Sequence, residues 1–209
     1  MCSIHEIMNT ADVLWAPWQE IYLASFPPNE RMTLSYFEQI LVRREVDDPL
    51  HILAMMDPED QNHVVCIAHY EVDIARKLSI LRYLATGAGL RGNGFGAEMY
   101  LAVRDRSRTD GADLMVFEVE IPAVTAGTSP ETAELARRRI QWYGRLGAVM
   151  VHGIRYTLDV DSTDERTPMY LMVHTDSEMD PEEIYGRLSA FFGSSVQRIG
   201  PVSVGGYAG

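Results

Sequence analysis

The stretch from Leu81 to Arg104 constrains the fold more than any other part of this sequence. An apolar run that ends at Thr86 passes into the glycine-rich segment Gly87–Gly96, and a helical pattern follows. Glycines lack Cβ, so consecutive main-chain N–H groups can curve around an anion, and the start of the helix adds unpaired N–H donors and the positive end of its dipole. The sequence therefore predicts a strand, an anion-binding turn and a helix, and a pyrophosphate-bearing cofactor is the natural ligand.

The glycine turn has two overlapping interpretations, and the first is a dinucleotide-binding fingerprint. Gly87, Gly89 and Gly92 form the pattern G-x-G-x-x-G. Glu118 or Glu120 lies about 26 residues further on, near the place of a ribose-binding acid. This interpretation predicts a nicotinamide-dependent oxidoreductase.

The second interpretation is the pattern R-x-x-G-x-G, formed by Arg91, Gly94 and Gly96 and followed directly by a helix. It resembles the acyl-CoA-binding motif of the GNAT N-acetyltransferase superfamily. The segment Arg137–Ala148 resembles the late-helix motif of that superfamily, in which a tyrosine faces the cofactor sulfur. Phe26–Arg31, which reads Phe-Pro-Pro-Asn-Glu-Arg, is similar to a loop in one branch of uncharacterised GNAT proteins. The resemblance covers about residues 10 to 175, and it favours the second interpretation. A dinucleotide fold would instead open on a parallel βαβ unit.

The resemblance implies an α/β (α+β) GNAT fold, with a central mixed and mostly antiparallel sheet flanked by helices. Hydrophobic periodicity predicts the elements. Helices are expected over residues 10–26, from 33, over 95–108, 129–147 and 181–192. Strands are expected over residues 51–56, 64–72, 78–86, 113–121, 149–158 and 169–174, with an uncertain first strand within 2–8. We expect residues 1–175 to form the acyltransferase domain, and residues 176–209 to add a C-terminal helix and a loose tail packed on the same domain.

Composition and charge limit the classes of partner that the protein is expected to bind. The chain of 209 residues has a formal net charge of −12, which argues against nucleic acid as a partner and suits a cationic acceptor such as an amine. Cys2 and Cys66 are too few for a disulfide framework, so a cytoplasmic location is expected. No apolar run approaches the ~20 residues of a membrane span, and the N-terminus has no signal-peptide pattern. The histidines show no metal-ligand spacing.

The GNAT resemblance implies acetyl-CoA as co-substrate and names the residues that would hold it. Main-chain N–H groups of the turn would bind the pyrophosphate, with the Arg91 side chain in charge-assisted contact. The end of the preceding strand would run beside the pantetheine arm and offer an N–H to the developing oxyanion. The cofactor-binding residues are then Leu84, Ala85, Thr86, Arg91, Gly92, Asn93, Gly94, Phe95 and Gly96.

Acyl transfer to an amine also needs an acid and a base. Tyr143 is the candidate acid for the departing thiolate, since a phenol has a pKa of about 10; its alternative role is that of a core aromatic. Strand alternation places Glu118 and Glu120 on one face, where either can act as the base or form a solvated polar face. Histone-type relatives carry a glutamate base where this chain has Ile80, so that base is not transferred.

Glu30, His69 and Glu71 are second-rank candidates for the acceptor site, and a structural role is the alternative for His69. The resulting hypothesis is an N-acetyltransferase that transfers an acetyl group to the primary amine of a small molecule in a ternary complex, because the turn has no nucleophilic cysteine beside it. A non-catalytic acyl-CoA-binding or sensing module is the first alternative. A homodimer, formed through an edge strand or the C-terminal segment, stays open.

Overall fold

One eight-stranded sheet forms the centre of the protein. The computed structural model describes residues 2–43, 49–61, 63–123, 129–159, 166–175 and 177–207. In the order of the chain the strands are β1 (Ile4–Glu6), β2 (Leu50–Met56), β3 (Val64–Asp73), β4 (Leu78–Thr86), β5 (Leu114–Glu120), β6 (Val149–Asp159), β7 (Arg166–His174) and β8 (Val196–Gly205). Their order in the sheet is β1-β2-β3-β4-β5-β7-β6-β8, and among these strands only β4 and β5 pair in parallel. The mixed, mostly antiparallel sheet is confirmed, and β1 is the uncertain first strand.

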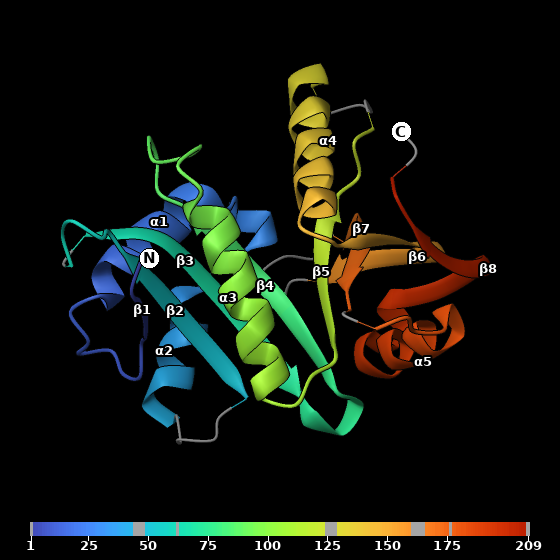
Figure 1. Ribbon diagram of the computed structural model, residues 1–209, viewed down its shortest axis with the longest axis horizontal. Coiled ribbons are helices and arrows are strands. Elements are labelled where there is room, and N and C mark those ends of the chain that lie inside the picture. The colour runs from blue at the N-terminus through green and yellow to red at the C-terminus, as the bar shows by residue number, and fades with distance from the viewer. Residues whose placement is uncertain are drawn as a thin grey trace.

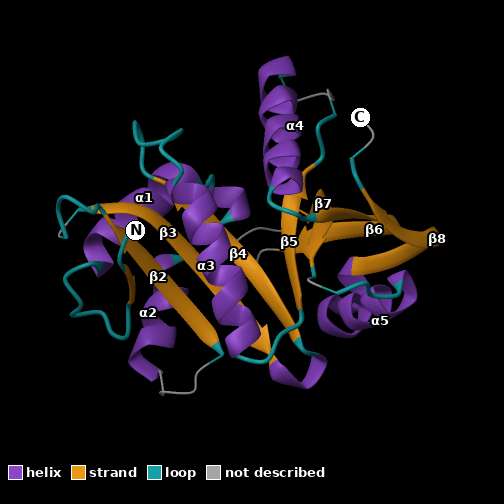
Figure 2. Ribbon diagram, in the orientation of Figure 1, coloured by secondary structure: helices purple, strands orange, loops and turns teal. Residues whose placement is uncertain are grey.

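Helices cover both faces of the sheet (Figures 1 and 2). They are α1 (Trp15–Ser25), α2 (Leu34–Arg43), α3 (Phe95–Thr109), α4 (Pro130–Arg145) and α5 (Pro181–Phe192), with short 3-10 turns η1 (Pro28–Glu30), η2 (Ile74–Arg76) and η3 (Gly193–Ser195). Apolar residues of α3 and α4 pack on one face. On the other face α1 and α2 cover the β2–β4 half, and α5 covers the β5–β8 half. No helix in the described ranges has the length and apolar character needed to cross a membrane.

Local sequence signals determine where helices begin. The Thr33 hydroxyl accepts a hydrogen bond from the Tyr36 N–H at 3.3 Å, just before α2. The Ser129 hydroxyl accepts one from the Thr132 N–H at 3.2 Å, and Pro130 occupies the first turn of α4. Both caps satisfy N–H groups that have no partner inside the helix. These two helix starts are therefore confirmed as predicted.

A β-bulge in β4 opens the sheet where the site lies. His69 pairs with Tyr83 and Tyr70 pairs with Leu81, so Arg82 is an extra residue in β4. On its other side β4 pairs with β5 only from Leu78 to Ile80. Figure 1 shows the two strands meeting at one end and separating towards the other, with α3 and α4 on either side of the opening.

The prediction of a loose tail is wrong for residues 196–205. They form β8, which pairs with β6, and Val196 and Val202 are buried. Gly153 of β6 has φ +78, and a Cβ there would lie 2.1 Å from the Pro201 carbonyl oxygen. The glycines and the proline of this segment hid the valine alternation, and the strand is stable because β6 leaves room for its main chain at Gly153.

Candidate active site

The glycine turn connects the end of β4 to the start of α3. Gly89, Gly92 and Gly94 have φ values of +79°, +92° and +87°, a region that residues with a Cβ rarely adopt. Across residues 91–97, no described group accepts a hydrogen bond from a main-chain N–H. The turn therefore presents consecutive N–H donors at a helix N-terminus, which is the arrangement that binds a phosphate group.

The turn is packed closely against α4. A Cβ on Gly96 would lie 3.3 Å from the Thr86 hydroxyl oxygen and 3.6 Å from the ring of Trp142. Arg91 is exposed and makes no ion pair with a described residue. The main chain of the turn can thus approach a ligand closely, and a guanidinium stands beside it.

The last three residues of β4 face the opening in the sheet. Leu84, Ala85 and Thr86 pair with β3 on one side. On the other side, none of the described strands pairs with them, because β5 leaves β4 after Ile80. This edge can accept an extended ligand as an added strand.

Tyr143 lies on α4 at the same opening. Its ring centroid is 4.3 Å from that of Phe117 on β5 and 5.4 Å from that of Tyr100 on α3. Burial raises the pKa of Tyr143, and Arg139 acts in the opposite direction. The hydroxyl is therefore protonated at neutral pH, as a general acid must be, although the side chain also packs as the core aromatic of the alternative interpretation.

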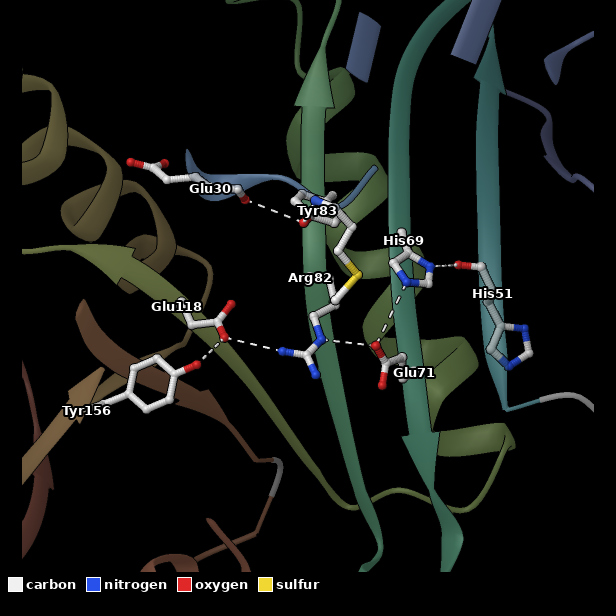
Figure 3. Close-up of polar contacts among 9 residues, drawn as sticks. Glu30, His51, His69, Glu71, Arg82, Tyr83, Glu118 and Tyr156 are labelled. Carbon is white, nitrogen blue, oxygen red and sulfur yellow. Dashed lines mark hydrogen bonds and ion pairs between the residues drawn. The ribbon is translucent and has the colours of Figure 1, made fainter. Parts of the chain in front are cut away.

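A partly buried ionic network crosses four strands on the other face of the sheet (Figure 3). Arg82 Nε donates to Glu71 Oε1 at 3.0 Å, and Arg82 Nη1 donates to Glu118 Oε1 at 3.4 Å. The Tyr156 hydroxyl donates to the same oxygen of Glu118 at 2.6 Å. The bulge makes this possible, because it adds Arg82 next to Tyr83 and lets the guanidinium reach between β3 and β5.

The network balances the charge of Glu118. Burial raises the pKa of Glu118, and Glu71 adds to this effect, whereas Arg82 and the Tyr156 hydroxyl lower it. For Arg82, burial works to lower the pKa, but Glu71 and Glu118 together raise it. The guanidinium thus stays charged, and Glu118 is a carboxylate whose affinity for a proton is increased.

Two further acidic residues, Glu120 and Glu30, lie near this network. Glu120 forms an ion pair with Arg139 of α4. Burial raises the pKa of Glu30 in η1; Glu120 raises it further, and Arg139 lowers it, so the three charges are neighbours. The Tyr83 hydroxyl donates to the Glu30 carbonyl oxygen at 3.4 Å, and the Glu30 side chain extends away from Tyr83 (Figure 3).

His69 is fully buried behind Glu71. Its Nδ1 lies 2.9 Å from the His51 carbonyl oxygen, which only accepts, so Nδ1 carries the hydrogen and Nε2 a lone pair. Nε2 lies 3.9 Å from Glu71 Oε1 and has no hydrogen-bond partner among the described residues. Burial lowers the pKa of His69 to about 4. The imidazole is therefore neutral at pH 7.

Comparison with known proteins gives the fold. No protein-family model matches the sequence, and no curated protein matches it. Among solved structures, a GNAT-family acetyltransferase of Bacteroides thetaiotaomicron is similar, with a TM-score of 0.69 and 24% identity over 91% of this chain and 98% of that one. This chain has the GNAT fold.

Two further GNAT-fold structures are similar at lower identity. One is a GNAT-family acetyltransferase of Elizabethkingia anophelis with acetyl-CoA bound, with a TM-score of 0.55 and 11% identity over 83% of this chain and 97% of that one. The other is the ribosomal-protein-S18-alanine N-acetyltransferase of Escherichia coli, with a TM-score of 0.55 and 17% identity over 86% and 97%. The likeness of the Phe26–Arg31 loop to one branch of GNAT proteins stays a prediction.

The GNAT fold brings most of the predicted residues to one opening. The turn of residues 91–96 and the end of β4 lie on its rim, and Glu118 and Glu120 share one face of β5, while Phe117 and Val119 are buried on the other. The expected strand alternation is thus confirmed. The dinucleotide interpretation needs a mainly parallel sheet, and β4 with β5 is the single parallel pair among the described strands.

Two residues of the network escaped sequence reasoning. Arg82 interrupts an apolar strand pattern, and a charge inside a buried strand was a signal that could have identified it. No sequence pattern indicates the role of Tyr156, because Tyr156 and Glu118 are 38 residues apart in the chain. Arg139 lies within the Arg137–Ala148 segment, and only the structure shows that it pairs with Glu120.

Proposed function

We propose that this protein is an N-acetyltransferase that transfers the acetyl group of acetyl-CoA to the primary amine of a small molecule in a ternary complex. The observation that carries the proposal is the run of main-chain N–H groups over residues 91–97, without a described acceptor, at the mouth of the opening between β4 and β5. The same fold holds acetyl-CoA in the Elizabethkingia anophelis structure, which supports the choice of co-substrate.

Binding of the co-substrate is assigned to the turn and to β4. The N–H groups of residues 91–96 and the Arg91 guanidinium bind the diphosphate. The free edge of Leu84, Ala85 and Thr86 pairs with the pantetheine arm, and a main-chain N–H of this edge stabilises the negative charge that develops on the carbonyl oxygen. Acetyl-CoA supplies an acyl group activated as a thioester.

The chemistry needs one proton removed and one delivered. The amine nitrogen forms a bond to the carbonyl carbon while the carbon–sulfur bond breaks. A carboxylate of β5, Glu118 or Glu120, accepts the proton of the amine, and Tyr143 donates its proton to the thiolate. The two glutamates and Tyr143 are buried or half-buried at the opening. The protons can therefore be transferred without solvent as a carrier.

The acceptor is assigned to the face that carries the acidic groups. Four carboxylates, of Glu30, Glu71, Glu118 and Glu120, surround two guanidinium groups, so an ammonium group is attracted there. His69 lies behind Glu71 and makes no hydrogen bond to it. We further propose that residues 1–175 contain this machinery, with the C-terminal segment packed on it, and that the protein works in the cytoplasm. Whether it forms a homodimer is a question for light scattering.

Calorimetry and a coupled assay test the proposal. Acetyl-CoA should bind with measurable heat where NADH does not, and a panel of small primary amines should include one that releases free CoA. Tyr143→Phe should lower kcat on that amine about 100-fold, while Tyr185→Phe on α5 should not. An absence of heat with acetyl-CoA would refute the proposal, and binding without release of CoA on any amine would favour the sensing module instead.

A further inference from the structure

The two side-chain donors that bind Glu118 share one of its two carboxylate oxygens. The Tyr156 hydroxyl at 2.6 Å and Arg82 Nη1 at 3.4 Å both donate to Oε1. Neither of these donors holds Oε2. A carboxylate fixed in this way keeps a defined orientation and still has one oxygen with which to take a proton.

We propose that Arg82 and Tyr156 are positioning residues that orient the Glu118 carboxylate and leave Oε2 to accept the proton of the acceptor amine. The inference rests on the proposed function, and it assigns the base to Glu118 rather than to Glu120. Arg82 and Tyr156 touch neither co-substrate nor amine; they act through Glu118.

The different partners of the two carboxylates support this assignment. The Glu120 side chain is 30% exposed and forms an ion pair with Arg139, whose charge also acts on Glu30. The Glu118 side chain is 9% exposed, and its cation is shared with Glu71. Burial raises the pKa of Glu118, so this carboxylate can take up a proton.

The groups that face Glu118 come from every element packed against it. Arg82 lies on β4 and Tyr156 on β6, and Glu71 reaches it from β3 through Arg82. On β7 the opposite residue is the apolar Leu171. From α5 the side chains are aromatic: Phe192 lies 4.9 Å from the Tyr156 ring, and Arg82 lies 5.9 Å from the Phe191 ring.

Glu71 limits the effect of Arg82. Because Arg82 Nε binds Glu71 at 3.0 Å and Nη1 reaches Glu118 at 3.4 Å, the shorter contact of the guanidinium is with Glu71. Glu71 raises the pKa of Glu118, opposite to the effect of Arg82. The arrangement therefore orients Glu118 without making it a permanent counter-ion.

The test removes one hydroxyl. Tyr156→Phe takes away a donor to the ionised carboxylate, so the acid limb of the kcat/KM profile for the amine should move up by about one pH unit. At pH values well below that limb, kcat/KM of Tyr156→Phe should be about tenfold lower than that of the wild type. At pH values well above it, the two should be equal, and the KM for acetyl-CoA should be unchanged. Tyr170→Phe is the matched control, since Tyr170 lies on the adjacent β7 on the opposite face of the sheet. Its profile should not move.

A second measurement needs no turnover. In protein labelled with ¹³C at glutamate side chains, the Glu118 carboxyl signal is the one that Glu118→Gln removes. Its titration should move up by about one unit in Tyr156→Phe, and should also move in Arg82→Lys, which keeps a charge but loses the forked geometry.

The outcomes separate the inference from the proposed function. An unmoved Glu118 titration in Tyr156→Phe, or an equal loss of kcat/KM at every pH, would overturn the positioning role while leaving acetyl transfer intact. A shifted titration in a protein that acetylates no amine and binds no acetyl-CoA would show that Tyr156 holds the Glu118 carboxylate, but it would refute the proposed function and with it the role of Glu118 as the base.

Discussion

Replacing His69 by asparagine tests whether this buried imidazole makes stability depend on pH. The asparagine amide nitrogen lies close to the position of Nδ1, so His69→Asn keeps the donor to the His51 carbonyl oxygen and removes Nε2. Nε2 is the only ring nitrogen that a proton can still join, and no described residue forms a hydrogen bond with it.

The size of the effect follows from the two pKa values. Burial lowers the pKa of folded His69 from 6.5 to about 4. Below pH 6.5 the unfolded chain therefore binds a proton that the folded chain does not, so stability falls as the pH decreases towards 4. The largest loss is about 3 kcal/mol, since each pKa unit corresponds to about 1.4 kcal/mol. At about pH 4.5 the loss should already reach roughly 2 to 3 kcal/mol.

Urea unfolding followed by tryptophan fluorescence measures this loss. The free energy of unfolding is compared for wild type and His69→Asn from about pH 7.5 down to about pH 4.5. Any pH-independent loss from the smaller side chain cancels in the comparison, and so do the other titrating groups. On acidification, the difference in free energy of unfolding between wild type and His69→Asn should change by roughly 2 to 3 kcal/mol in favour of His69→Asn. Parallel curves across this range would show that His69 binds protons equally in both states, and the reasoning would fail.

Further substitutions test the main chain at two glycines. Gly153→Ala should destabilise the protein by about 3 kcal/mol or more in chemical unfolding, because its Cβ would meet the Pro201 carbonyl oxygen at 2.1 Å; Gly186→Ala on α5, where a Cβ meets nothing within 4 Å, should stabilise it by about 0.5 to 1 kcal/mol. Equal effects of the two changes would contradict this. Gly94→Ala should weaken acetyl-CoA binding in calorimetry about five- to tenfold, since φ of +87° strains an alanine by about 1 to 2 kcal/mol and the turn would relax away from the ligand; an unchanged affinity would remove the turn from the binding site.

Local physics explains the parts of the fold that were predictable. The cap at Ser129 followed by Pro130, and the turn between β4 and α3, depend on residues close in sequence. The same applies to the shared face of Glu118 and Glu120, which follows from the two-residue period of a strand. The prediction of a loose tail is wrong at residues 196–205 because this strand depends on a partner, β6, that lies far away in the chain.

By itself the sequence determined the order of the elements, the glycine turn before α3 and the pair of acidic residues on β5, because each follows from main-chain preferences over a few neighbouring residues. Only the tertiary structure decided that Glu118 is bound by Arg82 and Tyr156 and that Glu120 is bound by Arg139. These contacts join residues 19 to 38 positions apart, and they depend on the bulge in β4 and on the packing of α4. The raised pKa of Glu118 follows from its burial, which exists only in the folded chain.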